Sequence, residues 1–279
     1  MAHRILMIDC PDEKGLVYRI TRELYDRGLN IISNHEFVDS TTGYFFMRTV
    51  VDNGQDLNHE IEEKLTSLLP EPANIRLTSI TNRPVVVMAT KESHCLGDLL
   101  LRNAYGELPS DIRAVVSNYD FLEPLVRSFN IPFHYVPHKG LERKEHEKKI
   151  LQVLEPYEPE YLVLAKYMRI FSPEFVAHFP SRMVNIHHSF LPAFAGASPY
   201  KQAFDRGVKI IGATAHFVTE DLDEGPIIAQ GVLPVNHSYT AEGMSQAGRD
   251  VEKNVLARAL KMVLEERVFI YKDKTILFD

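Results

Sequence analysis

The chain has 279 residues, of which 45% are hydrophobic and 25% are charged, and its formal net charge is −7. That length allows two domains of ordinary size, and the acidic balance argues against a nucleic-acid-binding surface. Because it has no uninterrupted apolar stretch of about 18 residues, no signal-peptide pattern and only two cysteines, we expect a cytoplasmic protein without a membrane span.

Apolar spacing in the N-terminal part predicts a small mixed domain. The expected elements follow the order strand, helix, strand, strand, helix, strand, which is the ferredoxin-like arrangement. The expected strands are residues 4–10, 30–38, 44–51 and 75–80, and the two helices carry Leu16, Ile20 and Leu24, and then Leu57, Ile61, Leu65 and Leu68.

Residues 81–84 mark the expected domain boundary, so we predict domains at 1–82 and 83–279. In the second domain, buried apolar runs alternate with helical segments, which favours a Rossmann-like, mostly parallel sheet with helices on both faces. A helix over 140–154 carries a charge run at 142–149 that we interpret as a solvated face, and a long helix is expected from about 241 to 264. The expected strands are 85–90, 112–117, 133–136, 161–165, 183–186 and 210–218.

Two polar clusters in this domain point to one site. Asn185 and His187 alternate at the end of an apolar run, so their side chains share a face of an extended strand. The segment 221–226 follows the next run, and ligands of open α/β sheets bind beyond the carboxyl ends of the strands. An amide, an imidazole and a carboxylate suit attack on a carbonyl carbon. The spacing alone does not select Asp223 over Asp221 or Glu224.

These histidines have two possible roles other than catalysis, one structural and one as metal ligands. A single histidine at a strand end is often a structural hydrogen-bonding residue. His187, His188, His216 and Asp223 are also possible metal ligands, but adjacent histidines on a strand point apart and the chain has no HExxH or CxxC spacing. We therefore expect no metal, and we interpret Cys95 as a small buried residue.

Residues 84–279 resemble the formyltransferase superfamily that uses formyltetrahydrofolate. The resemblance rests on the motif Asn-Ile-His followed by Ser-x-Leu-Pro, at 185–187 and 189–192, and on His-Phe-Val-Thr and Leu-Asp-x-Gly-Pro, at 216–219 and 222–226. It implies that Asn185, His187 and Asp223 are catalytic. It also implies substrate contacts at Met168, Arg169, Ile170, Phe171, His216 and Asp221, where the segment around Arg169 resembles the loop that holds the pterin ring.

Residues 1–82 resemble an ACT domain, a regulatory module that often binds amino acids. The likeness is carried by Asp12-x-x-Gly15-Leu16 and by Leu29-Asn30-Ile31. It implies an amino-acid effector, methionine or glycine, and a homo-oligomer, either a dimer or a tetramer. A module that only oligomerises is the alternative. The effector contacts would be Asp12, Gly15, Leu16 and Asn30.

An ACT module ahead of a formyltransferase-like domain resembles the formyltetrahydrofolate deformylase family. Transformylases carry a Gly- and Ser-rich phosphate loop where this chain has 91–97, and a proline where it has His188. The resemblance implies hydrolysis of 10-formyltetrahydrofolate to formate and tetrahydrofolate without a cofactor. This reaction would balance the one-carbon pool and supply formate for purine biosynthesis. The alternatives are formyl transfer to an amine acceptor, such as a nucleotide sugar or an aminoacyl-tRNA, and a non-catalytic folate sensor.

Overall fold

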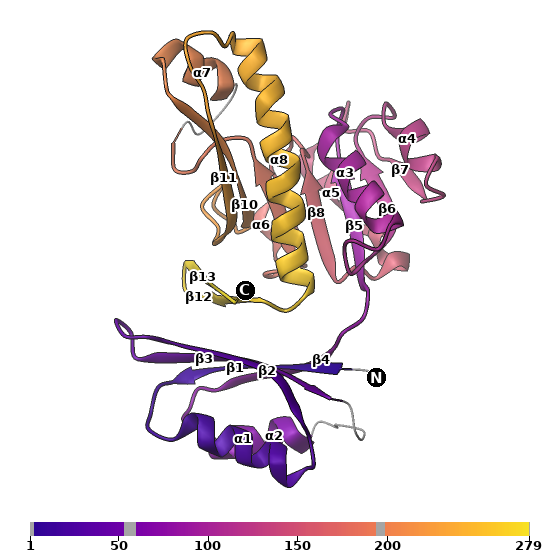
Figure 1. Cartoon of the computed structure of the whole chain (residues 1–279). Helices are drawn as coiled ribbons and strands as arrows, with labels where there is room; N and C mark the ends of the chain where they lie inside the picture. Colours follow the sequence, from indigo (N-terminus) through magenta and orange to yellow (C-terminus); the bar gives the residue numbers. More distant parts are fainter. Residues whose placement is uncertain (1–2, 53–59, 194–198, 279) are drawn as a thin grey trace. The chain divides into compact units, whose positions relative to one another are not determined.

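The computed structural model describes residues 3–52, 60–193 and 199–278 and divides the chain into two compact units (Figure 1). The first unit is Met1–Thr81 together with Glu265–Phe269 and Ile276–Asp279, and the second is Asn82–Leu264 with Ile270–Thr275. Residues near the C-terminus therefore group with the N-terminal unit, which apolar periodicity did not indicate. None of the helices in the described ranges is long and apolar enough to cross a membrane.

The N-terminal unit is an antiparallel sheet in the order β2-β3-β1-β4, with two helices on one face (Figure 1). The ferredoxin-like order expected from the sequence is confirmed, although Leu57 lies outside the described residues. Alternate strand residues such as Leu6 and Ile8 pack against Leu16 and Ile20 of the first helix. The elements are β1 (His3–Pro11), α1 (Leu16–Asp26), β2 (Ile31–Asp39), β3 (Tyr44–Asp52), α2 (Glu60–Leu68) and β4 (Asn74–Ser79).

The C-terminal unit is built on a seven-stranded sheet in the order β11-β10-β9-β8-β5-β6-β7. Strands β7, β6, β5, β8 and β9 are parallel, whereas β10 runs antiparallel to both neighbours, so the mostly parallel sheet is confirmed. Sequence analysis missed β11, because Gln230 and Gly231 interrupt its apolar run. The strands are β5 (Arg83–Ala89), β6 (Ser110–Ser117), β7 (Phe133–Tyr135), β8 (Tyr161–Ala165), β9 (Met183–His187), β10 (Ile210–Phe217) and β11 (Ile227–Pro234).

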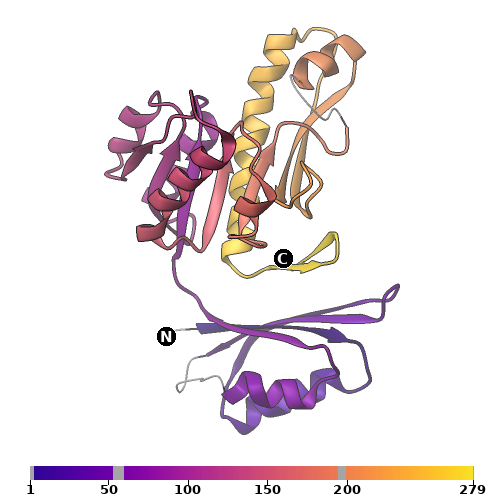
Figure 2. The same ribbon diagram turned by 180° about the vertical axis from the view of Figure 1, so that it is seen from behind.

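Helices cover both faces of this sheet, α3 and α8 on one and α5 and α6 on the other (Figures 1 and 2). The long helix expected near the C-terminus is confirmed as α8, which packs against β10, β11, α3 and α7. The remaining bounds are α3 (His94–Ala104), α4 (Glu123–Arg127), α5 (Arg143–Leu154), the 3-10 turn Glu155–Tyr157, α6 (Pro173–Val176), α7 (Pro199–Arg206), α8 (Ala241–Leu264), β12 (Val268–Tyr271) and β13 (Lys274–Leu277).

Candidate active site

The end of β9 brings two predicted catalytic side chains to one face. Asn185 and His187 are alternate residues of this strand, as the sequence predicts. The antiparallel neighbour β10 pairs His216 with Asn185 and Thr214 with His187. The Asn185 amide nitrogen lies 3.2 Å from His216 Nε2. Residues about 30 positions apart therefore meet through the register of two strands.

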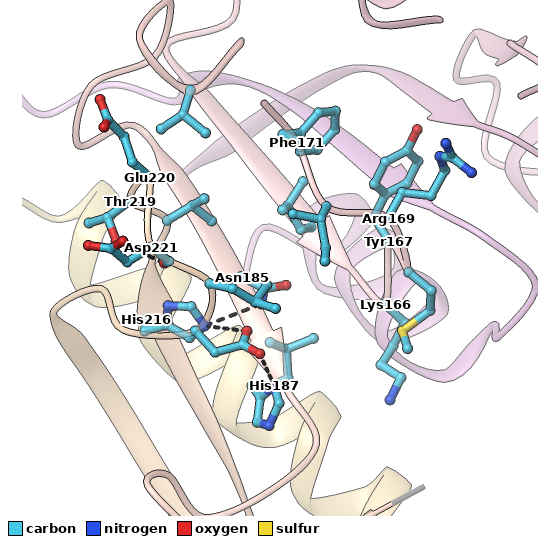
Figure 3. A pocket seen from close by; sticks show the side chains of 18 of the residues that line it. Lys166, Tyr167, Arg169, Phe171, Asn185, His187, His216, Thr219, Glu220 and Asp221 are labelled. Carbon is cyan, nitrogen blue, oxygen red and sulfur yellow. Dashed lines mark hydrogen bonds and ion pairs between the residues drawn. The ribbon is translucent and has the colours of Figure 1, made fainter. Parts of the chain in front are cut away.

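Asp223 comes from the loop after β10 and lies against His187 and His216, two side chains that Figure 3 labels. Its Oδ2 is 3.2 Å from His187 Nδ1, and its Oδ1 is 3.6 Å from His216 Nε2. Gly225 makes this approach possible, because a Cβ at that position would overlap the carbonyl of Phe217. The structure thus distinguishes Asp223 from Asp221 and Glu224, which the spacing in the sequence did not.

Hydrogen bonds set the charge of this carboxylate. Burial alone would raise the pKa of Asp223, but hydrogen bonds from His187 and His216 outweigh it and hold that pKa well below its usual range. His216 Nδ1 donates to the Phe217 carbonyl over 2.8 Å, which directs Nε2 toward Asp223. His187 Nε2 is buried and has no hydrogen-bond partner among the described residues. When the His187 ring is protonated, its Nε2–H can donate a hydrogen bond to a reacting group.

A cavity of about 300 Å³ opens beside these side chains. The segment between β8 and α6 forms one wall, and Phe171 is fixed there by stacking between Tyr167 and Phe175, at centroid distances of 5.3 and 4.1 Å. Met168 and Ile170 are more than half exposed. The residues that the resemblance assigned to substrate all lie on the cavity walls, namely Met168, Arg169, Ile170, Phe171, His216 and Asp221.

Sequence reasoning missed other side chains of the same cavity. Lys166 is the first residue after the apolar run of β8, so the rule that selected His187 at the end of β9 applies to it equally. His188 also lines the cavity, and burial, followed by the charges of Lys166 and His187, lowers its pKa to about 4. Its ring is therefore neutral at neutral pH.

Buried hydrogen bonds hold the wall formed by residues 166–171. Glu147 of α5 accepts from the backbone N–H and the hydroxyl of Ser172, at 2.7 and 2.6 Å, and Ser172 caps α6. Thr90 donates to the Lys166 carbonyl over 2.7 Å. The interpretation of the charge run 142–149 as a solvated face is wrong at His146 and Glu147, which are buried. Glu147 anchors the segment because its carboxylate lies where Ser172 begins a helix.

The segment after His187 is fixed by β10 and β11. Thr214 donates to the Ser189 carbonyl over 2.9 Å and accepts from the backbone N–H of Leu191 over 3.1 Å. Gln230 of the missed strand β11 donates to the Leu191 carbonyl over 3.0 Å. These contacts fix the chain that carries His188 into the cavity wall.

The predicted effector residues do not form one cluster. The backbone N–H of Asp12 donates a hydrogen bond to the Gly43 carbonyl, next to the end of the sheet where Pro11 pairs with Tyr44. The backbone N–H of Asn30 donates to the carboxylate of Asp52, at the opposite end of β3. Strands of this length place those two ends roughly 25 Å apart. Gly15 precedes α1 with a φ of 92°, and Leu16 is buried in the core. Within one chain, Asp12 and Asn30 are therefore too far apart to contact the same small molecule.

Comparisons with known proteins agree with this architecture. The formyl transferase family matches residues 83–260, and the ACT domain family matches residues 4–68. A formyltetrahydrofolate deformylase of Haemophilus influenzae is 54% identical over 274 residues, which cover 98% of each chain. The crystal structure of a formyltetrahydrofolate deformylase from Pseudomonas syringae pv. tomato has a TM-score of 0.96 at 39% identity, covering 100% of this chain and 95% of that one.

A glycinamide ribonucleotide transformylase from Symbiobacterium toebii is less similar. Its crystal structure has a TM-score of 0.68 at 28% identity, and the match covers 71% of this chain and 95% of the transformylase chain. The C-terminal unit is thus a formyl transferase domain and the N-terminal unit carries an ACT domain. The deformylases match both parts at higher identity, and the chain belongs to the formyltetrahydrofolate deformylase family.

Proposed function

We propose that the protein hydrolyses 10-formyltetrahydrofolate to formate and tetrahydrofolate, and so releases formate for purine biosynthesis while balancing the one-carbon pool. The observation that carries the proposal is the contact of Asp223 with both His187 and His216, beside Asn185, at one end of the cavity. Membership of the deformylase family supports the choice of water over an amine acceptor.

The geometry suits a tetrahedral intermediate. As the water oxygen bonds to the formyl carbon, negative charge develops on the formyl oxygen, and the Asn185 amide and a protonated His187 donate to it through Nδ2 and Nε2. Asp223 accepts a hydrogen bond from the Nδ1–H of His187, which orients the ring. The carbon–nitrogen bond then breaks, and the leaving nitrogen of tetrahydrofolate takes the proton that the attacking water has given to Asp223.

The low pKa of Asp223 implies that this carboxylate acts first as a partner of His187 and only later as a base. A carboxylate held so far below its usual range is a weak base before the reaction, so it first stabilises an imidazolium at His187. It accepts the proton of the attacking water only as the new carbon–oxygen bond makes that proton acidic. The proposal assigns the chemistry to these side chains, with the folate as substrate and no cofactor.

Formate release without any added acceptor tests the proposal. We expect the wild-type protein to release formate, and Asp223→Asn and His187→Ala to bind folate but lose about 10²–10³ in rate. Glu224→Gln is the matched control, because Glu224 is an exposed carboxylate on the same loop that does not line the cavity. Full turnover by Asp223→Asn would refute the assignment, and folate binding without formate release would favour a transferase or a sensor.

We further propose that the ACT domain binds a small amino acid, methionine or glycine, and that the protein is a homo-oligomer. Asp12 and Asn30 lie at opposite ends of the sheet, so a site that uses both requires two copies of the chain. Effector titration of formate release, with sedimentation in parallel, tests both parts; monomers that still respond would contradict the shared site. The free, buried thiols of Cys10 and Cys95 support a cytoplasmic location.

A further inference from the structure

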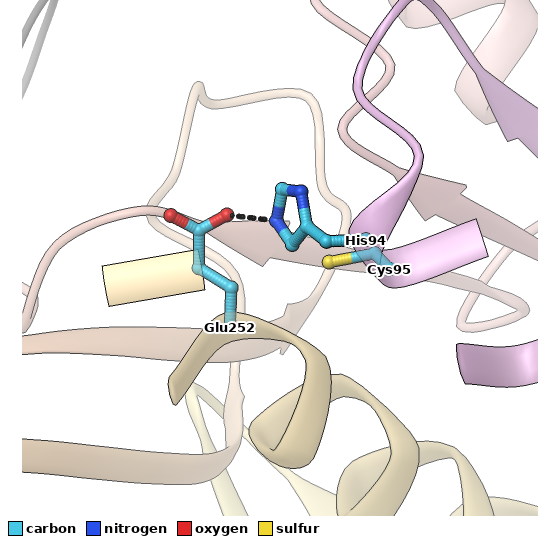
Figure 4. Close-up of side chains that lie close together, drawn as sticks. All are labelled: His94, Cys95 and Glu252. Atoms are coloured by element: carbon cyan, nitrogen blue, oxygen red, sulfur yellow. Dashed lines mark hydrogen bonds and ion pairs between the residues drawn. The ribbon is translucent and has the colours of Figure 1, made fainter. Parts of the chain in front are cut away.

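A buried cluster of charged and polar side chains adjoins the cavity wall near His187 and His188. At its centre is Glu252 of α8, which accepts three hydrogen bonds or ion pairs. Lys166 Nζ and His94 Nε2 lie 3.2 and 2.7 Å from Oε2, and the Tyr200 hydroxyl lies 2.6 Å from Oε1 (Figure 4 shows His94 and Glu252). We call Glu252, Lys166, His94 and Tyr200 the Glu252 cluster.

Stability alone does not account for the Glu252 cluster. The side chains of Lys166 and Glu252 are only 4% and 1% exposed. Removing two charges from water costs several kcal/mol per ion, and apolar replacements of buried pairs are often neutral or stabilising. Burial alone would raise the pKa of Glu252, but hydrogen bonds from His94 and Tyr200 and the charge of Lys166 hold it at about 2. The chain thus keeps an ionised pair inside the domain.

Of the Glu252 cluster, only Lys166 lines the cavity. Lys166 and His188 line the cavity together with His187, whereas Glu252 does not. Both carboxylate oxygens of Glu252 are engaged, so this part of the wall is formed by His188 and by Lys166, whose ammonium Glu252 holds. The His188 ring lies between the catalytic site and the cluster, with its centroid 5.2 Å from that of His187 and 6.3 Å from that of Tyr200.

The neighbouring thiol does not turn this cluster into a favourable metal centre. His94, Cys95 and Glu252 bring possible ligand atoms within 4.8 Å of one another (Figure 4). Burial, followed by the charge of Glu252, raises the pKa of the Cys95 thiol well above its ordinary value, and metals bind the thiolate. Lys166 and Tyr200 already occupy the lone pairs of the carboxylate. The donor set is that of an ion-pair cluster.

We propose that the Glu252 cluster makes the reaction selective for water, by holding Lys166 and His188 as the wall that faces the formyl group. The neutral His188 ring accepts a hydrogen bond from the attacking water and aims its oxygen at the formyl carbon. The Lys166 ammonium repels acceptor amines, which are mostly cationic at neutral pH because their pKa is about 8. Behind this wall, the side chains of Glu252 and Tyr200 are buried.

In this inference, which rests on the proposed hydrolysis, Glu252 is a positioning residue that acts through Lys166. Its test is the partition of the formyl group between water and a small amine. The protein is given 10-formyltetrahydrofolate with a fixed excess of glycinamide at pH 7, and formate and N-formylglycinamide are measured together. We expect the wild-type protein to yield formate and almost no formylated amine.

Lys166→Met removes the ammonium and keeps most of the side-chain length. We expect the ratio of formylated amine to formate to rise about tenfold or more, because the local repulsion of cations is lost. The kcat for formate should fall about tenfold, while KM for the folate changes little. Lys166→Met/Glu252→Gln removes both charges, so it avoids leaving an unpaired buried carboxylate and should fold even if the single variant does not.

Lys144→Met is the matched control, because it removes a lysine from an exposed pair with Glu174 on the surface of the same unit. Its product ratio and kcat should equal those of the wild type. The inference is overturned if the double variant folds, binds folate and keeps the wild-type ratio and kcat. A wild-type protein that releases no formate would overturn the proposed hydrolysis as well, so the two failures are distinguishable.

Discussion

Gly248 offers a sharp test of how closely the Glu252 cluster is packed. This glycine lies on α8 one turn before Glu252, and a Cβ at its position would overlap the ring and hydroxyl of Tyr200. The Tyr200 ring can avoid a methyl group only by moving, and its 2.6 Å hydrogen bond to Glu252 then breaks. Gly248→Ala should therefore destabilise the protein, although alanine is ordinarily the better helix former.

The magnitude follows from three contributions. Losing a hydrogen bond to a charged group costs about 1.5–3 kcal/mol, and forcing a methyl group into a packed site costs about 1–3 kcal/mol. The helical preference of alanine over glycine returns about 1 kcal/mol. The net loss is about 1.5–5 kcal/mol, which for a unit of this size lowers Tm by roughly 10 °C.

The control lies on the same helix. A Cβ at Gly243 would meet Thr240 Oγ1 at 3.4 Å, which is close to ordinary contact, so Gly243→Ala should raise Tm by a few degrees through helix preference, roughly 2–4 °C per kcal/mol. Thermal unfolding followed by circular dichroism compares the two variants with the wild type. Equal or higher stability of Gly248→Ala relative to Gly243→Ala would refute the packing argument.

Three further outcomes are expected. Since the pKa of His188 is lowered to about 4 in the folded protein, the wild type should lose stability as pH falls from 6.5 toward 4, and the Tm of His188→Asn should show less of that loss. Glu147→Gln leaves one donor of Ser172 poorly paired, so it should raise KM for the folate more than it lowers kcat; the reverse pattern would contradict an anchoring role. Gly225→Ala should lower formate turnover about 100-fold, because the overlap with the Phe217 carbonyl displaces the catalytic carboxylate; unchanged kcat would show that the loop adapts.

The sequence by itself determined most of the elements and part of the site. Apolar periodicity predicted most of the strands and helices, and alternation along a strand placed Asn185 and His187 on one face. Lys166 likewise follows directly after the apolar run of β8, a position that also indicates a residue at the carboxyl edge of the sheet. These inferences succeed because local periodicity records which side of an element faces the core.

Only the tertiary structure decided which distant side chains meet. The choice of Asp223 depends on a loop that folds back on β10, and the pairing of Lys166 with Glu252 depends on the packing of α8 against β9 and α3. The registers of β1, β2 and β3 likewise separate Asp12 from Asn30, which the resemblance to an ACT domain had named together as effector contacts. Buried polar contacts of this kind are set by strand register and helix docking, which leave no periodic signal in the chain.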